Sequence, residues 1–173
     1  MAGAWQRIRQ RIGMGGLLIG LIILAAIVFI AVSVSRDLAG EPVDTAAGRQ
    51  FPCTVESVYD GDGPINCTEK DANGQPVKVR LRGIEARETD NSCQVPNLCT
   101  AASGEAAKAM LVSLAVGRLQ CTSFGPSYSR VDASCRNAAG IDLSCEMIRT
   151  GNAARWAQYD PEGRLAACVP QTR

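Results

Sequence analysis

A long apolar run occupies the N-terminal part of the chain, between Arg11 and Arg36. About 20 apolar residues are enough to cross the hydrocarbon core of a bilayer as a helix. The run therefore predicts a transmembrane helix over residues 12–35, followed by a small, polar linker over residues 36–50. A cleavable signal peptide is the alternative interpretation. Its apolar region, however, is typically about 7–15 residues long, which is shorter than this run.

Basic residues are distributed unequally about this predicted span. Arg7, Arg9 and Arg11 precede it, whereas Arg36 is the one basic residue close behind it. Lys and Arg are enriched on the cytoplasmic side of membrane spans. We therefore expect residues 1–11 to lie in the cytoplasm of a single-pass inner membrane protein, with the C-terminal domain periplasmic or otherwise extracytoplasmic.

Beyond the linker, apolar and polar residues alternate in the way that is typical of β-strands. Strands are predicted over residues 53–59, 65–68, 77–84, 119–122 and 131–135, and loops over residues 85–101 and 123–129. Helices are predicted between Ser103 and Gly117, over residues 142–149 and over residues 153–159. The order of these elements indicates an α+β, mainly β domain over residues 51–173, in which two to three helices pack on a small antiparallel barrel.

All eight cysteines lie beyond the apolar run. They are Cys53, Cys67, Cys93, Cys99, Cys121, Cys135, Cys145 and Cys168. An even number of cysteines in an exported domain indicates disulfides, whereas free thiols would fit a cytosolic domain. Three pairings are favoured because each pair flanks a turn or a short loop: 93 with 99, 121 with 135, and 53 with 67.

The absence of histidine narrows the chemistry that this chain can perform. Ser-His-Asp triads, Cys-His pairs and histidine-ligated zinc sites are excluded, so acid–base chemistry must come from other groups, such as carboxylates. The whole chain carries a net charge of +1. From Asp37 onward, however, 14 basic residues stand against 17 acidic ones, a net charge of −3. Binding of a polyanion would therefore have to be local, through a few arginines.

Three short motifs carry candidate chemistry: Tyr59–Asp62, Val79–Glu88 and Tyr128–Arg130. Each alone has an ordinary explanation, because Asp-Gly forms turns and alternating arginines suit a solvated strand face. In this order, and together with the stretch from Gly140 to Ala153, they resemble the staphylococcal nuclease (thermonuclease-like) family. The resemblance covers roughly residues 52–160 and implies a five-stranded barrel of the OB type with helices.

The resemblance also implies a calcium-dependent phosphodiesterase that cleaves DNA or RNA without sequence specificity. Asp62, Glu85 and the backbone carbonyl of Ala86 would be the metal ligands. Calcium prefers oxygen ligands and tolerates irregular geometry, so these groups suit it.

The same resemblance assigns three catalytic side chains. Glu88 would orient or deprotonate the attacking water, while Arg80 and Arg130 would bind the scissile phosphate. Guanidinium groups bind phosphate oxygens in a bidentate fork and offset the charge of the transition state. Arg82 has a weaker claim, because the matching family position is not usually catalytic.

Four positions depart from the family pattern. Glu85 replaces an aspartate, Gly63 replaces a threonine, Arg87 replaces a proline, and Ser129 replaces a glycine. The change at Arg87 predicts a less rigid corner that gains positive charge.

Three hypotheses follow for the domain. The first is a membrane-tethered nuclease outside the cytoplasm. The second is a non-catalytic binding or scaffold module of the cell envelope built on the same barrel. The third is a disulfide-rich structural domain whose arginines are only solvated surface.

Overall fold

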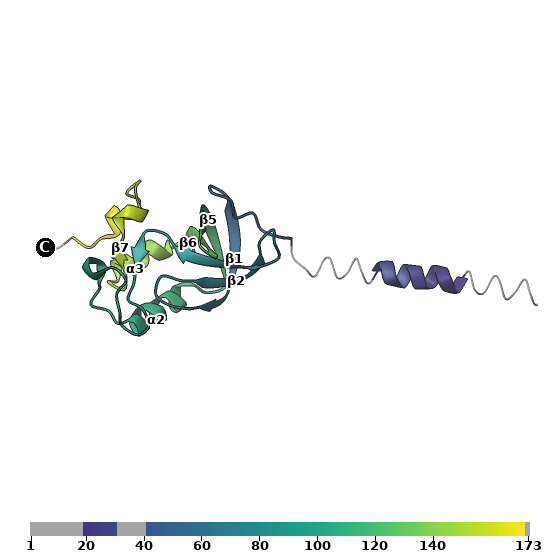
Figure 1. Ribbon diagram of the computed structural model, residues 1–173, viewed down its shortest axis with the longest axis horizontal. Helices are drawn as coiled ribbons and strands as arrows, with labels where there is room; N and C mark the ends of the chain where they lie inside the picture. Colours follow the sequence, from purple (N-terminus) through teal and green to yellow (C-terminus); the bar gives the residue numbers. More distant parts are fainter. Residues whose placement is uncertain (1–18, 31–40, 172–173) are drawn as a thin grey trace, which may run out of the picture. The chain divides into compact units, whose positions relative to one another are not determined.

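The computed structural model describes residues 19–30 and 41–171 (Figure 1). The chain divides into two compact units, Met1–Gly40 and Glu41–Arg173. In the first unit, residues 19–30 are helical.

The predicted transmembrane helix is only partly covered by the described residues. No helix within residues 19–30 or 41–171 has both the length and the apolar character needed to cross a membrane. The remainder of the predicted span, the predicted cytoplasmic segment 1–11 and residues 36–40 of the predicted linker lie outside the described residues.

Five strands of the second unit form a closed barrel in the order β1-β2-β3-β6-β5. Their bounds are Gln50–Val58 for β1, Ile65–Lys70 for β2, Pro76–Leu81 for β3, Arg118–Ser127 for β5 and Arg130–Arg136 for β6. The predicted five-stranded barrel is thereby confirmed. Alternation along β3 buries Val77, Val79 and Leu81 in the core and leaves Arg80 on the other face.

The prediction that this barrel is wholly antiparallel is wrong, because β3 and β6 pair in parallel. The reason is geometric. Strand directions cannot alternate around a closed ring of five, so at least one neighbouring pair must run the same way. In this pair Arg80 lies opposite Asp132, and Val79 lies opposite Val131. The parallel pairing therefore brings Arg80 close to the start of β6, where Arg130 lies.

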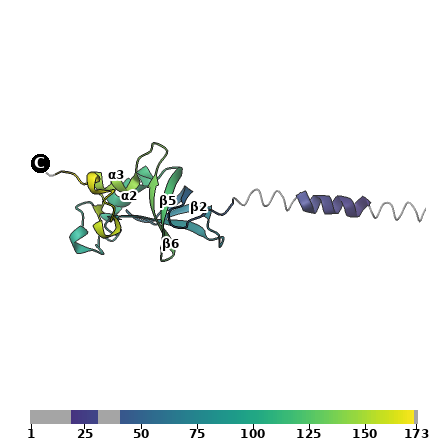
Figure 2. The same ribbon diagram turned by 90° about the horizontal axis from the view of Figure 1, so that it is seen from above.

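Two α-helices and the C-terminal segment lie together on one side of the barrel (Figures 1 and 2). Helix α2 spans Gly104–Leu114 and α3 spans Leu143–Arg149. Their first turns are capped by Ser103 and Asp142, whose side chains accept hydrogen bonds from backbone amides. These two predicted helices are confirmed.

The predicted helix over residues 153–159 is wrong. A short strand, β7 (Ala154–Arg155), instead pairs with β4 (Ile84–Glu85), and a 3-10 turn, η2 (Ala157–Tyr159), follows. The pairing continues into a hydrogen bond from the Trp156 amide to the Gly83 carbonyl. Bonds to a distant segment thus override the local helical tendency. Two further 3-10 turns are η1 (Pro96–Leu98) and η3 (Ala166–Cys168).

Two strand boundaries also differ from expectation. The predicted loop over residues 123–129 is largely strand, because β5 continues to Ser127 past an irregularity at Gly125. Conversely, the third strand ends at Leu81 rather than Ile84. Gly83 follows with a φ of 76°, a left-handed conformation that turns the chain into β4.

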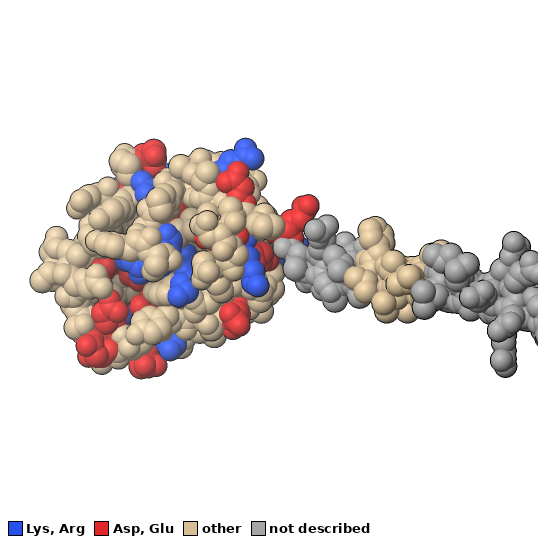
Figure 3. Space-filling model, turned by 45° about the vertical axis from the view of Figure 1, so that its right-hand side comes forward, with Lys and Arg blue, Asp and Glu red and all other residues tan. Residues whose placement is uncertain are grey.

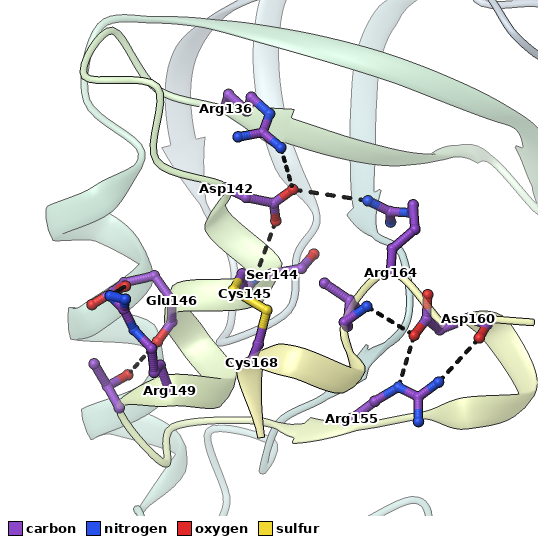
Figure 4. Close-up of a disulfide and its surroundings, with 12 residues drawn as sticks. Arg136, Asp142, Ser144, Cys145, Glu146, Arg149, Arg155, Asp160, Arg164 and Cys168 are labelled. Carbon is purple, nitrogen blue, oxygen red and sulfur yellow. Dashed lines mark hydrogen bonds and ion pairs between the residues drawn. A yellow bond between two sulfur atoms is a disulfide. The ribbon is translucent and has the colours of Figure 1, made fainter. Parts of the chain in front are cut away.

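Four disulfides hold the described unit together. The three favoured pairings are confirmed: Cys53–Cys67 joins β1 to β2, Cys121–Cys135 joins β5 to β6, and Cys93–Cys99 closes a loop. The fourth, Cys145–Cys168, ties the C-terminal segment to α3 (Figure 4). The barrel disulfides are fully buried beside apolar residues such as Phe51 and Leu119, so they form part of the core.

Candidate functional site

Four of the predicted site residues come from four separate places that the fold brings close together. Asp62 lies in the β1–β2 turn, Arg80 lies on β3 and Glu85 lies on β4, while Arg130 begins β6. The sequence could suggest each turn and strand separately. The closure of the barrel is what places them side by side.

Asp62 is buried and makes several bonds. Its Oδ1 lies 2.6 Å from Nη1 of Arg80, and its Oδ2 accepts a hydrogen bond from the Ala86 amide at 3.0 Å. Its backbone carbonyl accepts from the Leu81 amide at 2.9 Å. The neighbouring Gly63 has a φ of 113°, and a Cβ there would lie 2.5 Å from the Val79 carbonyl oxygen. Glycine at position 63, where the family has threonine, is therefore required by the turn.

Arg80 bridges the two predicted acidic ligands. Its Nη2 donates to Oε2 of Glu85 at 3.1 Å and to the Ile84 carbonyl at 3.3 Å, in addition to its contact with Asp62. Glu85 is 2% exposed, and its second oxygen, Oε1, has no hydrogen-bond partner in the described part of the chain. One guanidinium thus contacts two buried carboxylates, and one carboxylate oxygen is left without a partner.

Carboxylates outnumber guanidinium groups in this cluster. Buried Asp60 accepts a hydrogen bond from the Asp62 amide at 3.1 Å, which adds a third acid. Burial raises the pKa of Asp62 to about 8; Arg80 opposes this, but the negative charges of Asp60 and Glu85 add to it. Burial also raises the pKa of Glu85, again against Arg80 and with a contribution from Glu88. The cluster therefore contains more carboxyl groups than the single guanidinium of Arg80 can keep ionised.

The chemistry of these donors fits a hard cation such as calcium. Carboxylate oxygens are the preferred ligands of Ca²⁺, and Glu85 offers an oxygen to which no described residue donates. In the arrangement described, Arg80 occupies both carboxylates. Within residues 19–30 and 41–171, no group of three or more acidic, cysteine or histidine residues converges as a metal site. Ala86, the third predicted ligand, contributes its amide to Asp62. Asp62 and Glu85 are thus the residues that could hold the ion.

A pocket of about 200 Å³ opens beside this cluster. Both predicted phosphate-binding arginines, Arg80 and Arg130, line it, together with the aromatic residues Tyr128, Trp156 and Tyr159. The Arg130 side chain is half-buried and makes no hydrogen bond or ion pair with another described residue, in contrast to that of Arg80. The pocket therefore combines one engaged and one available guanidinium with aromatic surfaces.

A larger groove of about 670 Å³ adjoins this pocket and shares Tyr128 and Arg130 with it. Lys78 and the β2–β3 turn form its other side. Figure 3 shows one face of the domain on which Lys and Arg side chains gather near the middle and acidic side chains lie mostly toward the edge. A negatively charged chain could follow such a surface even though the whole unit is acidic.

Glu88 lies in the loop after β4 and does not line the pocket. Its Oε1 accepts a hydrogen bond of 2.7 Å from Nε2 of Gln94, which does line the pocket. The start of α2 fixes the backbone here, because a Cβ on Gly104 would lie 1.7 Å from the Glu88 carbonyl oxygen. The sequence alone does not indicate Gln94, because a glutamine in a loop belongs to no recognisable motif.

Arg87 supports the corner that was expected to lose rigidity. Its Nε donates to the Thr100 carbonyl at 2.7 Å and its Nη1 donates to the Asn91 carbonyl at 2.8 Å. Hydrogen bonds from Arg87 thus hold both sides of the loop, which a proline could not do.

Arg82 has a structural partner instead of a place in the pocket. It pairs with Asp132, and its guanidinium carbon lies 4.4 Å from the centre of the Phe124 ring. Both contacts hold β3 against the β5–β6 hairpin. Arg82 thus has a structural use, whereas the resemblance assigned it only a weak claim to a catalytic role.

Comparison with known proteins yielded no family assignment: neither a protein-family model nor a curated protein matches this chain. The function of the domain is therefore inferred from the site itself and from the motif resemblance.

Proposed function

We propose that the barrel domain is a nuclease, that is, a calcium-dependent phosphodiester hydrolase that acts on DNA or RNA without sequence specificity. One observation carries the proposal. Arg80 and Arg130, on neighbouring parallel strands, line a single pocket, and Arg80 also contacts two buried carboxylates. Phosphoryl transfer requires positive charge at the phosphate oxygens together with a site for a cation, and these groups could supply both.

The pocket suits a nucleotide in a chain. The guanidinium of Arg130 has no partner among the described residues, so it is available to a phosphate. Tyr128 is 97% exposed, and the Trp156 and Tyr159 rings meet edge to face with centroids 4.6 Å apart. Aromatic rings stack on any base, and arginines contact phosphates rather than base edges. Recognition would therefore be independent of sequence.

The chemical roles follow from the groups present. Asp62 and Glu85 would hold calcium, which when bound supplies positive charge beside the phosphate. Glu88 would accept a proton from the attacking water, whose oxygen bonds to phosphorus as the bond to the leaving oxygen breaks. Arg80 and Arg130 would offset the charge on the remaining phosphate oxygens.

We also propose that the N-terminal segment anchors this domain to the inner membrane, with the barrel on the periplasmic or extracytoplasmic side. The uncharged apolar run and the three arginines before it support this orientation. Four disulfides support an oxidising compartment for the barrel.

The second candidate is a binding or scaffold module without catalysis. The observation that favours it is the engagement of Arg80, whose guanidinium contacts two carboxylates and donates to two backbone carbonyls. An arginine used in this way is less available to a phosphate. The pocket could then bind a nucleic acid strand through Arg130 and the aromatic residues alone.

A cleavage assay with a matched pair of variants separates these functions. Full-length protein, kept oxidised and in mild detergent, is incubated with single-stranded DNA or RNA in calcium and then with a chelator. Arg130→Ala should reduce the cleavage rate by about 100-fold or more and leave thermal stability unchanged, because Arg130 has no partner to lose. Arg118→Ala, at the other end of β5, should leave the rate unchanged.

Each result of this assay bears on one candidate. Calcium-dependent cleavage that is lost in Arg130→Ala supports the nuclease. Binding of DNA without cleavage, weakened by the same substitution, would favour the non-catalytic module. Neither binding nor cleavage by the folded wild-type protein would contradict both and leave the structural role.

A further inference from the structure

The loop between β4 and α2 carries one polar residue, Gln94, that lines the pocket. Gln94 lines the pocket with Arg80 and Arg130, and its amide nitrogen donates to Oε1 of Glu88 at 2.7 Å. Within the described residues, this is the one hydrogen bond to the Glu88 carboxylate. Gln94 fixes one oxygen of Glu88 and leaves the other without a protein donor.

The position of Gln94 is fixed by a small disulfide ring. Cys93, its neighbour, is bonded to Cys99, and the ring between them contains η1. The Glu88 amide donates to the Ser92 carbonyl at 3.0 Å, so the backbone just before the ring is bound to the residue that Gln94 contacts.

The rest of the loop is held from both sides. Arg87 donates to two of its carbonyls, as described above, and Oδ1 of Asn91 accepts from the Gly104 amide at the start of α2 at 3.0 Å. Asn91 itself has a φ of 66°, which lets the chain turn back toward Glu88. A loop of this length without regular structure would otherwise sample many conformations.

We propose that Gln94, held by the Cys93–Cys99 ring, is a positioning residue that orients Glu88 toward the pocket. The inference rests on the proposed function, in which Glu88 accepts the proton of the attacking water. A free glutamate side chain samples several rotamers, and a base contributes only in the rotamer that reaches the water. A donor on Oε1 selects one rotamer and leaves Oε2 for the water.

The test is a double-mutant cycle on full-length, oxidised protein with single-stranded DNA and calcium. Gln94→Met keeps the length of the side chain and removes the donor. We expect kcat to fall roughly five- to tenfold with little change in KM, since one hydrogen bond is lost and the arginines that hold the phosphate remain. Gln120→Met, an exposed glutamine on β5, is the matched control and should leave kcat unchanged.

The cycle also distinguishes positioning from a general structural effect. In a Glu88→Gln background, Gln94→Met should produce no further loss, because its only route to the reaction is through Glu88. The double variant Cys93→Ser/Cys99→Ser should lower kcat to a similar extent as Gln94→Met, and it should do so in protein whose thermal unfolding shows an intact barrel.

The outcomes are separable from those of the proposed function. An active wild type whose kcat is unchanged by Gln94→Met would overturn the positioning role and leave the nuclease in place. Equal losses in the wild-type and Glu88→Gln backgrounds would also overturn it, because Gln94 would then act independently of Glu88. A folded wild type without any cleavage would overturn the proposed function and this inference together.

Discussion

Two clusters of buried charge in the barrel domain differ in the ratio of guanidinium to carboxylate. Around Asp160, Arg155 donates at 2.7 Å and the Leu165 amide donates at 3.0 Å to the same oxygen of one carboxylate (Figure 4). Around Arg80, a single guanidinium contacts two carboxylates, and a third lies next to them. The Asp160 cluster has one guanidinium for its one carboxylate, whereas the Arg80 cluster has one guanidinium for three carboxyl groups.

The pKa shifts follow this ratio. Burial alone would raise the pKa of Asp160, but the hydrogen bonds from Arg155 and the Leu165 amide, with the charges of Arg155 and Arg164, hold it below its usual value. Burial raises the pKa of Asp62 to about 8 in spite of Arg80. Both clusters contain a buried oxygen without a hydrogen bond, so an orphan oxygen does not distinguish them. The ratio of guanidinium to carboxyl groups does distinguish them. The Asp160 cluster is balanced and anchors the C-terminal segment, whereas the Arg80 cluster lacks positive charge that a bound cation would supply.

The largest expected effect comes from breaking the balanced cluster. Asp160→Ala leaves the half-buried Arg155 and the Leu165 amide without their partner, and the free energy of unfolding should fall by about 3 kcal/mol. Chemical unfolding under oxidising conditions measures this. Glu162→Ala, an exposed neighbour, should change the stability by less than about 0.5 kcal/mol. A loss that small for Asp160→Ala would mean that the pair does not hold the segment.

A part of this effect should depend on pH. The folded pKa of Asp160 lies below its unfolded value of 3.8, so its ionised form stabilises the fold at pH values above that. This contribution is lost as the pH falls through the folded pKa. The stability difference between wild type and Asp160→Ala should therefore narrow on acidification below about pH 4. A difference that widened on acidification would contradict the sign of the shift.

The smallest expected change in stability has the opposite sign and lies in the unbalanced cluster. Glu85→Gln removes one of the competing buried charges, so with chelator present the variant should be as stable as wild type or about 1 kcal/mol more stable. Calcium should then stabilise wild type, by about 2.7 kcal/mol at one hundred times its dissociation constant, and should stabilise Glu85→Gln much less. Thermal unfolding with and without calcium checks both. Marked destabilisation of Glu85→Gln without calcium would contradict this, because Glu85 would then stabilise the fold through its arginine in the same way as Asp160 does.

The local features of the fold could be predicted from the sequence. The alternation of apolar and polar residues along β3 puts Arg80 on the face away from the buried Val79 and Leu81. Short turns between cysteines indicated three of the disulfides. Both features depend on residues that are close in the sequence. The parallel pairing of β3 with β6 and the strand β7 depend on distant segments, so local patterns did not reveal them.

The candidate site shows the same limit. Individual residues such as Asp62 and Arg130 were identified by their motifs. Their contacts depend on side chains that converge only in three dimensions. Arg80 meets its two acids because barrel closure brings their segments together. Gln94 meets Glu88 because the disulfide ring holds the loop that carries both residues. The requirement for glycine at position 63 arises from a carbonyl on β3 and could not be seen in the turn alone.

The rate of single-stranded DNA cleavage by oxidised, full-length protein tests the central claim most directly. It is measured in calcium and again after chelation, with Arg130→Ala alongside wild type. The account predicts cleavage by wild type that stops on chelation and falls by about 100-fold or more in Arg130→Ala at unchanged thermal stability. Absence of cleavage by folded wild-type protein in calcium, or cleavage that persists undiminished in Arg130→Ala, would contradict it.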